Sequence, residues 1–282
     1  MCATDGAGHE GWGDIVQGWA DRFGVETAQA ALEADARGVP MYRLWKNDVV
    51  RRVRIAALLI GSTDEVVRDA RVLRAAGFAS VKLKVGGLSI RQDIDRVFRV
   101  REALGPDVLL RLDANRAWEY SVAMAFGTAT RDAGIEFYEE PVKRPQDIAQ
   151  FHGATGLPVA LDETLRDTSA EDWQKLPGVA CLVIKPSLVG GIDRTLELAD
   201  IGRKNCLKVV ISSAYESGVG WMALAHLAAA VGGEDTAAGL GTRRWMQGDV
   251  LNPAPPIDAP EVDPASLSTR NYPVDRGRLL DT

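Results

Sequence analysis

The sequence predicts an α/β protein, in which parallel strands and helices alternate and the strands close into a (β/α) TIM-type barrel. Three observations support this class. Short apolar runs recur about every 25 residues, as expected for a repeating strand–helix unit. Stretches with helical periodicity separate these runs. Five of the runs end in a charged residue, and the carboxyl ends of barrel strands meet at one face.

Eight segments of the chain have the composition of strands. In order they are 54–59, 80–85, 109–114, 136–140, 158–163, 180–185, 208–213 and 236–241. The stretches 63–77, 89–105 and 191–205 are amphipathic, and the first two close on a glycine, a common helix stop. This alternation predicts a parallel sheet covered by helices, and eight strands favour a closed barrel over an open sheet.

Two segments lie outside the repeating period. Residues 1–50 hold GHEGWGDI and then a helical stretch, RFGVETAQAALEADARG. Residues 251–282 are rich in Pro and Asp and are expected to form an extended tail on the barrel. Neither is large enough for an independent domain, so the expected division is 1–50, a barrel over 51–250, and 251–282.

The composition excludes several classes of function. The net charge is −6 and no basic stripe is present, which argues against nucleic-acid binding. No apolar run approaches the roughly 18 residues that a membrane span needs, and the start lacks a secretory pattern. Cys2, Cys181 and Cys206 are too few and too widely spaced for a disulfide framework or a thiolate metal site. We therefore expect a cytoplasmic protein that acts on a small molecule, with its oligomeric state left open.

Three acids stand at the ends of the third, fourth and fifth expected strands. They are Asp113, in LLRLDAN, Glu139 or its neighbour Glu140, in EFYEEP, and Asp162, in PVALDET. Buried charges are unfavourable unless they are paired or bound to metal. Oxygen ligands from separate strands suit a hard cation, so we expect Mg²⁺, with Mn²⁺ as an alternative.

Two lysines end the second and sixth expected strands. In a ring of eight strands Lys84 and Lys185 would face each other across the centre. Lys82 shares a strand face with Lys84, and a lysine beside a second cation has a lowered pKa and can act as a base. A metal-bound carboxylate has a more acidic α-proton, so this arrangement suits proton abstraction. The alternative is that these charges form structural ion pairs.

Six motifs, in this order, resemble the enolase superfamily in its muconate-lactonizing subgroup, and most closely the o-succinylbenzoate synthase family of menaquinone and phylloquinone biosynthesis. The motifs are VKLKVG, LRLDANRAW, YEEP, LDET, VIKPSLVGG and ISSAYESGVG. The resemblance covers roughly residues 50–245. It implies a modified (β/α)7β barrel, with 1–50 as a truncated remnant of an N-terminal capping domain and the tail packed on barrel and cap. It also implies location in the cytoplasm, or in a plastid for a photosynthetic source.

The resemblance assigns roles to individual residues. Lys84 would be the base and also the acid that helps the hydroxyl depart, Lys82 would orient Lys84, and Lys185 would stabilise an enediolate. Glu139 rather than Glu140 would join Asp113 and Asp162 on Mg²⁺. The remaining residues would orient the cluster or bind substrate; they are Arg111, Asn115, Gly190, Gly191, Ser212 and Ser213.

The implied reaction is the syn-dehydration of 2-succinyl-6-hydroxy-2,4-cyclohexadiene-1-carboxylate to 2-succinylbenzoate, which makes the protein a carbon–oxygen lyase. Gly241, in GLGT, replaces an acid that bacterial relatives usually carry at the barrel mouth. Two alternatives remain open. One is an N-acylamino acid racemase or dipeptide epimerase, and the other is a catalytically weak barrel that serves as an assembly partner.

Overall fold

The computed structural model describes residues 1–14, 22–47, 49 and 51–279. The chain forms two compact units. The central unit comprises Ala56–Val183 and Gly202–Lys208. The terminal unit comprises Met1–Ile55, Ile184–Ile201 and Val209–Thr282.

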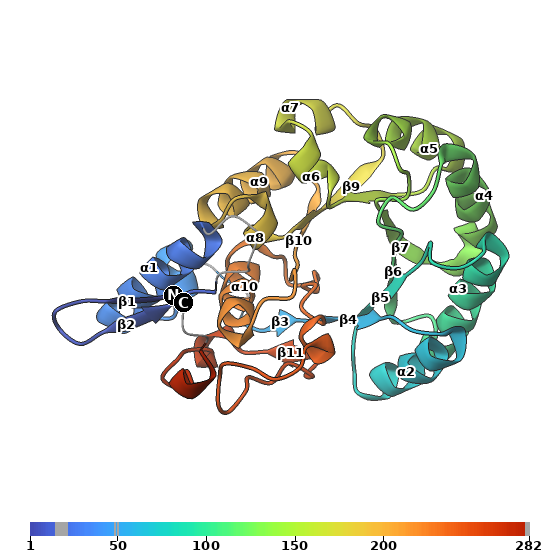
Figure 1. Ribbon diagram of the computed structural model, residues 1–282. Helices are drawn as coiled ribbons and strands as arrows, with labels where there is room; N and C mark the ends of the chain where they lie inside the picture. Colours follow the sequence, from blue (N-terminus) through green and yellow to red (C-terminus); the bar gives the residue numbers. More distant parts are fainter. Residues whose placement is uncertain (15–21, 48, 50, 280–282) are drawn as a thin grey trace. The chain divides into compact units, whose positions relative to one another are not determined.

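The central unit is built on a parallel sheet whose strands are adjacent in the order in which they occur in the chain. These strands are β4 (Ala56–Leu59), β5 (Ser80–Lys84), β6 (Leu109–Asp113), β7 (Ile135–Glu139), β8 (Val159–Leu161) and β9 (Val179–Ile184). Helices follow the strands and lie along the outside of the curved sheet (Figure 1). They are α2 (Thr63–Ala75), α3 (Ile90–Leu104), α4 (Tyr120–Thr130) and α5 (Ile148–Thr155), with short helices α6 (Thr164–Asp167) and α7 (Ala170–Trp173) after β8.

Local sequence sets the ends of these helices. Ser62 and Glu65 form a reciprocal capping box at the start of α2, and Ser89 and Gln92 do the same for α3. Each box satisfies backbone N–H groups that the first helical turn leaves without partners. Gly105 then ends α3 at a φ of 72°, a conformation that glycine adopts without a steric penalty. The helices therefore begin and end where the sequence pattern predicts.

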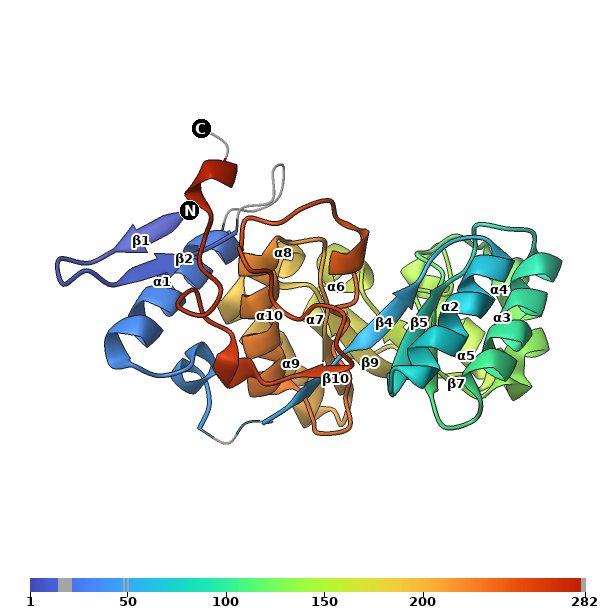
Figure 2. The same ribbon diagram turned by 90° about the horizontal axis from the view of Figure 1, so that it is seen from below.

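The terminal unit contains both chain ends. The strands β1 (Cys2–Thr4) and β2 (Glu10–Trp12) form a hairpin, and α1 (Arg22–Arg37) packs against β2, as Figure 2 shows. The tail strand β11 (Glu261–Val262) pairs with β3 (Val53–Arg54). The rest of this unit includes α8 (Pro186–Val189), α9 (Ile192–Lys204), β10 (Lys208–Ile211) and α10 (Gly218–Val231).

Helix α10 forms the core of the terminal unit. Every residue from Gly218 to Val231 is buried, as expected for a helix that is apolar on all sides. His226 lies in this helix, as predicted from its apolar surroundings, and its Nε2 atom lies 2.8 Å from the carbonyl oxygen of Leu267. No described helix is both long enough and apolar enough to cross a membrane.

The α/β class and its parallel sheet are confirmed, but the eighth expected strand is wrong. Within the described residues, 236–241 form only isolated parallel bridges, from Ala238 to Ile55 and from Gly239 to Ser212. The segment TAAGLG is made largely of small residues, which have little side chain to pack on a sheet. The division at residues 50 and 250 remains a prediction, and parts of its end segments lie outside the described residues.

Candidate active site

Charged residues from neighbouring strands of the central unit stand side by side in the sheet register. Lys84 pairs with Asp113, and Asp113 pairs with Glu139, each being the last residue of its strand. Asp162 follows the end of β8, two positions beyond Ala160, the register partner of Glu139. Neighbouring strands lie about 4.8 Å apart, so the fold gathers these groups at one edge. We call Lys82, Lys84, Asp113, Glu139 and Asp162 the acid–lysine cluster.

Lys82 lies between two of the acids. Its Nζ atom is 2.8 Å from Asp113 Oδ2 and 3.0 Å from Glu139 Oε1. Both carboxylates are buried. Burial by itself lowers the pKa of Lys82, but the charges of Asp113, Glu139 and Asp162 outweigh burial and raise the pKa above its ordinary value. Lys82 is therefore held as an ammonium ion.

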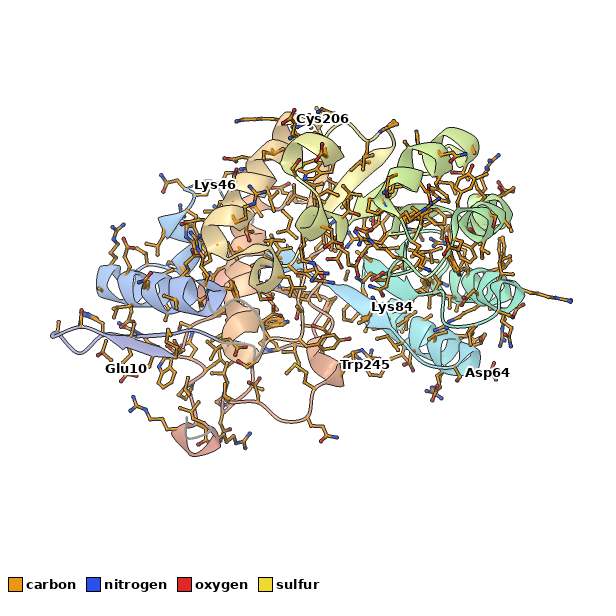
Figure 3. The ribbon with its side chains drawn as sticks, turned by 45° about the horizontal axis from the view of Figure 1, so that its top comes forward. Glu10, Lys46, Asp64, Lys84, Cys206 and Trp245 are labelled. Atoms are coloured by element: carbon orange, nitrogen blue, oxygen red, sulfur yellow. The ribbon has the colours of Figure 1, made fainter. Side chains whose placement is uncertain are left out.

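Lys84 contacts the cluster from the neighbouring position on the same strand face. Its Nζ atom lies 2.6 Å from Asp113 Oδ2 and 2.5 Å from Asn115 Oδ1 (Lys84 is labelled in Figure 3). Burial opposes ionisation of Asp113, but Lys82 and Lys84 outweigh it and hold the pKa of this carboxyl well below its usual range. One carboxylate thus binds both ammonium groups.

Asn115 and Glu163 support Lys84. Asn115 donates its backbone N–H to Asp113 Oδ1 at 3.1 Å and its side-chain amide to Glu163 Oε1 at 3.0 Å. Because the amide nitrogen donates to Glu163, the amide oxygen must face Lys84. The orienting role of Asn115 remains a prediction. The role of Glu163 was not foreseen, although this residue directly follows Asp162.

The donor chemistry of the three acids fits a hard cation, since all of the candidate ligand atoms are buried carboxylate oxygens. Their arrangement does not form a ready-made metal site. Among the described residues, no three His, Cys, Asp or Glu side chains are grouped closely enough to hold an ion. The Lys82 ammonium lies between Asp113 and Glu139, so a bound cation would have to replace its contacts there.

The structure distinguishes Glu139 from Glu140, which the alternation of strand residues leaves unresolved. Glu139 contacts Lys82, whereas Glu140 Oε2 lies 2.9 Å from Arg116 Nε. Glu140 has a φ of 44°, which takes it out of the strand alternation directly after β7. Glu139 therefore belongs to the acid–lysine cluster and Glu140 to a different network.

Arg111 forms an ion pair with Glu136, outside the acid–lysine cluster. Its Nε atom donates to Glu136 Oε2 at 2.6 Å, and Glu136 also pairs with Lys208. The guanidinium lies over the ring of Phe137, 5.0 Å from its centroid. These buried contacts explain how Arg111 is accommodated inside the central unit. Its predicted role in orienting Asp113 or binding substrate remains a prediction.

A second polar group lies in the terminal unit, around the carboxylate of Glu216. Glu216 accepts from Ser187 Oγ at 2.5 Å, from Ser213 Oγ at 2.7 Å and from the N–H of Ala214 at 2.8 Å. Ser212 Oγ donates to the carbonyl of Gly239 at 3.2 Å. We call Ser187, Ser213 and Glu216 the serine–Glu216 cluster. Glu216 lies in a motif identified in the sequence, but its role was missed.

The remaining predicted residues adjoin this second cluster along the chain. Lys185 precedes α8, and it belongs to the terminal unit, so its opposition to Lys84 remains a prediction of the ring order. Gly190 and Gly191 have φ values of 111° and 100°. Their N–H groups both donate to the carbonyl of Pro186. These amides thus have acceptors within the chain, and their proposed binding of a substrate carboxylate remains a prediction.

A parallel sheet whose strands are adjacent in chain order, with helices along its outside and charged residues at the carboxyl ends of its strands, is the architecture of α/β-barrel proteins. Residues 65–266 match the family described as enolase C-terminal domain-like, and the chain belongs to this family.

Relatives of known name agree with this assignment. The chain is 39% identical over 221 residues to the chloroplastic protein PHYLLO of Arabidopsis thaliana, a match covering 71% of this chain and 13% of PHYLLO. It is 36% identical over 216 residues to the o-succinylbenzoate synthase of Pasteurella multocida, covering 74% of this chain and 63% of that enzyme. The chain therefore spans less than two thirds of each of these relatives.

A solved structure supports the same fold. A dipeptide epimerase from Enterococcus faecalis, complexed with Mg and the dipeptide L-Leu-L-Tyr, superimposes with a TM-score of 0.78 at 27% identity. The match covers 86% of this chain and 70% of the epimerase. The resemblance of the sequence motifs to the enolase superfamily is thereby confirmed.

Proposed function

We propose that the chain is an o-succinylbenzoate synthase, which removes water from 2-succinyl-6-hydroxy-2,4-cyclohexadiene-1-carboxylate. The observation that carries the proposal is the acid–lysine cluster, in which Lys84, Asp113 and Glu139 end three adjacent strands in register. The similarity to the synthase of Pasteurella multocida supports the choice of reaction.

Asp113, Glu139 and Asp162 would hold Mg²⁺. When bound, the ion would stabilise negative charge that develops on the substrate carboxylate during proton loss. The epimerase complexed with Mg supports this choice of ion. Lys82 would then give up its contacts with Asp113 and Glu139. Lys82 would also orient Lys84, its neighbour on the same strand face.

Lys84 would take the proton from C1 of the substrate, the carbon that bears the carboxylate. The electron pair left on C1 would form the new ring double bond as the hydroxyl leaves C6. In a syn elimination the proton and the hydroxyl leave the same face, so the Lys84 ammonium could return its proton to the departing oxygen as water. Asn115, held by Glu163, would keep Lys84 directed toward both atoms.

Lys185 would place a positive charge near the carboxylate as negative charge develops there. Backbone N–H groups of Gly190, Gly191, Ser212 and Ser213 would help to hold the succinyl carboxylate. Arg111 would act indirectly, through the packing of the strand that carries Asp113. The substrate is a small carboxylate, and no nucleic-acid or membrane partner is proposed.

An assay with and without a chelator tests this function. We expect the ultraviolet absorbance of the cyclohexadiene to fall, and 2-succinylbenzoate to form, when protein and Mg²⁺ are present. EDTA should abolish the reaction and excess Mg²⁺ should restore it; Mn²⁺ can be compared in the same assay. Absence of product under all these conditions would overturn the proposal.

A racemase or dipeptide epimerase is the second candidate, supported by the similarity to the epimerase of Enterococcus faecalis. Such a reaction would use Lys84 and Lys185 on opposite faces of one carbon. Incubation with an N-succinyl amino acid or a dipeptide in D₂O distinguishes the two candidates. Deuterium incorporation without dehydration of the cyclohexadiene would favour racemisation, and inactivity in both assays would favour an assembly role.

The compartment follows from the same proposal. A bacterial synthase would act in the cytoplasm, and the chloroplastic relative supports the plastid as the location for a photosynthetic source. Localisation of a tagged full-length protein in the source organism would distinguish these compartments.

A further inference from the structure

The turns that follow β6 and β7 contain backbone conformations that are unusual for residues with side chains. Asn115, Arg116 and Glu140 have φ values of 42°, 59° and 44°. A positive φ is unfavourable for residues other than glycine, and it persists where surrounding contacts enforce it. Here the Arg116 N–H donates to the Glu140 carbonyl at 2.9 Å, so the two turns are joined through their backbones.

The carboxylate of Glu140 uses both of its oxygens. Oε1 accepts from the backbone N–H groups of Asp162 and Thr164, each at 2.8 Å. Oε2 accepts from Thr164 Oγ1 and from Arg116 Nε, each at 2.9 Å. The side chain is completely buried. With four donors already bound, Glu140 is occupied with contacts inside the protein.

These contacts fix the segment that carries the third proposed ligand. Asp162 follows β8, at the point where the chain leaves the sheet and enters α6. The N–H of Asp162 is bound by Glu140, and the N–H of Thr164, two residues later, is bound by the same oxygen. Since a side chain follows the position and direction of its backbone, Glu140 restricts where the Asp162 carboxylate can lie.

Arg116 extends this network to the next helix. Its Nη2 atom donates to Thr164 Oγ1 at 2.8 Å, and its Nη1 atom donates to Asp167 Oδ2 at 2.5 Å. Arg116 therefore joins the turn after β6, which follows Asp113, to the segment after β8, which carries Asp162. Glu140 contacts both segments and directly follows Glu139. The network of Glu140 and Arg116 therefore includes residues adjacent in sequence to each of the three acids.

We propose that Glu140, held by Arg116, is a positioning residue that sets the backbone of Asp162 and thereby the geometry in which the three acids bind Mg²⁺. This inference rests on the proposed function, because it concerns the same metal. Residues that orient metal ligands typically contribute 10- to 100-fold to metal affinity. Glu140 would act through Asp162 and would contact neither the ion nor the substrate.

Calorimetric titration of the full chain with Mg²⁺ tests the proposal. In Glu140→Gln the side chain keeps its shape, but an NH₂ group replaces one acceptor oxygen and meets donors such as Arg116. We expect a dissociation constant for Mg²⁺ that is about 10- to 100-fold larger than for the wild type. Thr164→Val keeps both backbone hydrogen bonds to Glu140 Oε1 and should change the constant by about threefold or less.

Glu216→Gln is the matched control, since Glu216 is also a buried carboxylate that accepts three hydrogen bonds, but in the terminal unit. It should leave Mg²⁺ affinity within about twofold of the wild type. In an Asp162→Asn background, Glu140→Gln should weaken Mg²⁺ binding little further, because both changes act on one ligand. A purely structural role would instead lower the midpoint of thermal unfolding in the absence of Mg²⁺ and leave the affinity unchanged.

Two outcomes would overturn different claims. If the wild type bound no Mg²⁺, the proposed metal function would fail. If the wild type bound Mg²⁺ and a folded Glu140→Gln bound it equally well, only the positioning role would fail. Should Glu140→Gln not fold, Arg116→Ala replaces it, because Arg116 is partly exposed and its loss removes the charged one of the two donors to Glu140 Oε2 named above. Wild-type Mg²⁺ affinity in Arg116→Ala would then reject the network.

Discussion

The acid–lysine cluster and the serine–Glu216 cluster accommodate buried carboxylates in different ways. Asp113 and Glu139 contact the ammonium groups of lysines on β5. Glu216 is bound by two hydroxyls and one backbone N–H, all neutral donors. An ammonium group that pairs with a carboxylate can be replaced there by a metal ion or by a charged group of a substrate. Hydroxyl and N–H donors instead form hydrogen bonds of fixed direction, which hold the hydroxyls in one orientation. The first cluster therefore suits proton and metal chemistry, and the second suits positioning.

The largest expected effect is on the base. Lys84→Ala removes the group proposed to take and return the proton, and general acid–base catalysis contributes roughly 10²- to 10⁴-fold to rates. Because Lys84 would serve both steps, we expect kcat to fall by about 10³-fold or more. Single-turnover dehydration, followed by ultraviolet absorbance, measures this change.

Lys143→Ala is the control for that experiment. Lys143 is an exposed lysine of the central unit that pairs with Glu119 on the surface, and such pairs contribute little to stability. Its kcat should equal that of the wild type. If Lys84→Ala turned over substrate at the wild-type rate, the acid–lysine cluster would not be the site of proton transfer.

Buried groups in the two regions should also contribute differently to the pH dependence of the free energy of unfolding. Burial lowers the pKa of His226, in the terminal unit, to about 4 from its ordinary 6.5. Between these values the unfolded chain binds more protons than the folded one, so the free energy of unfolding falls as the pH falls from 6.5 to 4. This group alone contributes a loss of about 3 kcal/mol over that range and none above about pH 7.5. Asp113, whose pKa lies far below its usual range, stays charged throughout.

Urea unfolding at a series of pH values measures this dependence. His226→Gln keeps a side-chain donor that can reach the Leu267 carbonyl but does not titrate, so it is the matched control. Its free energy of unfolding should fall less steeply between pH 6.5 and 4 than that of the wild type. Equal slopes in the two proteins would show that His226 does not cause the acid sensitivity.

The difference between the two regions also explains what the sequence could predict. Period and composition were sufficient to place Lys84, Asp113 and the pair Glu139 and Glu140 at strand ends, because parallel strands of similar length bring their last residues together. The helices over 63–77 and 89–105 were equally predictable, since each carries an amphipathic pattern and a capping box.

Contacts that depend on turn conformation and on strand register could not be predicted from the sequence pattern. Glu140 departs from strand alternation through its positive φ, and Arg111 meets Glu136 where the register of β6 and β7 shifts. The segment 236–241 failed as a strand for a related reason: a Cβ atom on Gly239 would lie 2.6 Å from Ser212 Oγ. Close approach of two backbones, rather than side-chain packing, shapes that part of the terminal unit.

The smallest expected effect concerns the serine–Glu216 cluster. In Glu216→Gln the amide oxygen must face the Ala214 N–H, which can only donate, so the amide nitrogen faces Ser187 Oγ. The Ser187 hydroxyl, which donates to Glu216 in the wild type, must then turn and accept. Ser187 lies two residues after Lys185, so we expect KM for the cyclohexadiene to rise by about 10-fold, as for one lost charge-assisted hydrogen bond.

Steady-state kinetics at saturating Mg²⁺ measure this rise. Ser266→Ala, which removes an exposed hydroxyl of the same unit, is the control and should leave KM unchanged. A Glu216→Gln protein with normal KM but weakened Mg²⁺ binding would contradict the division of roles between the two clusters.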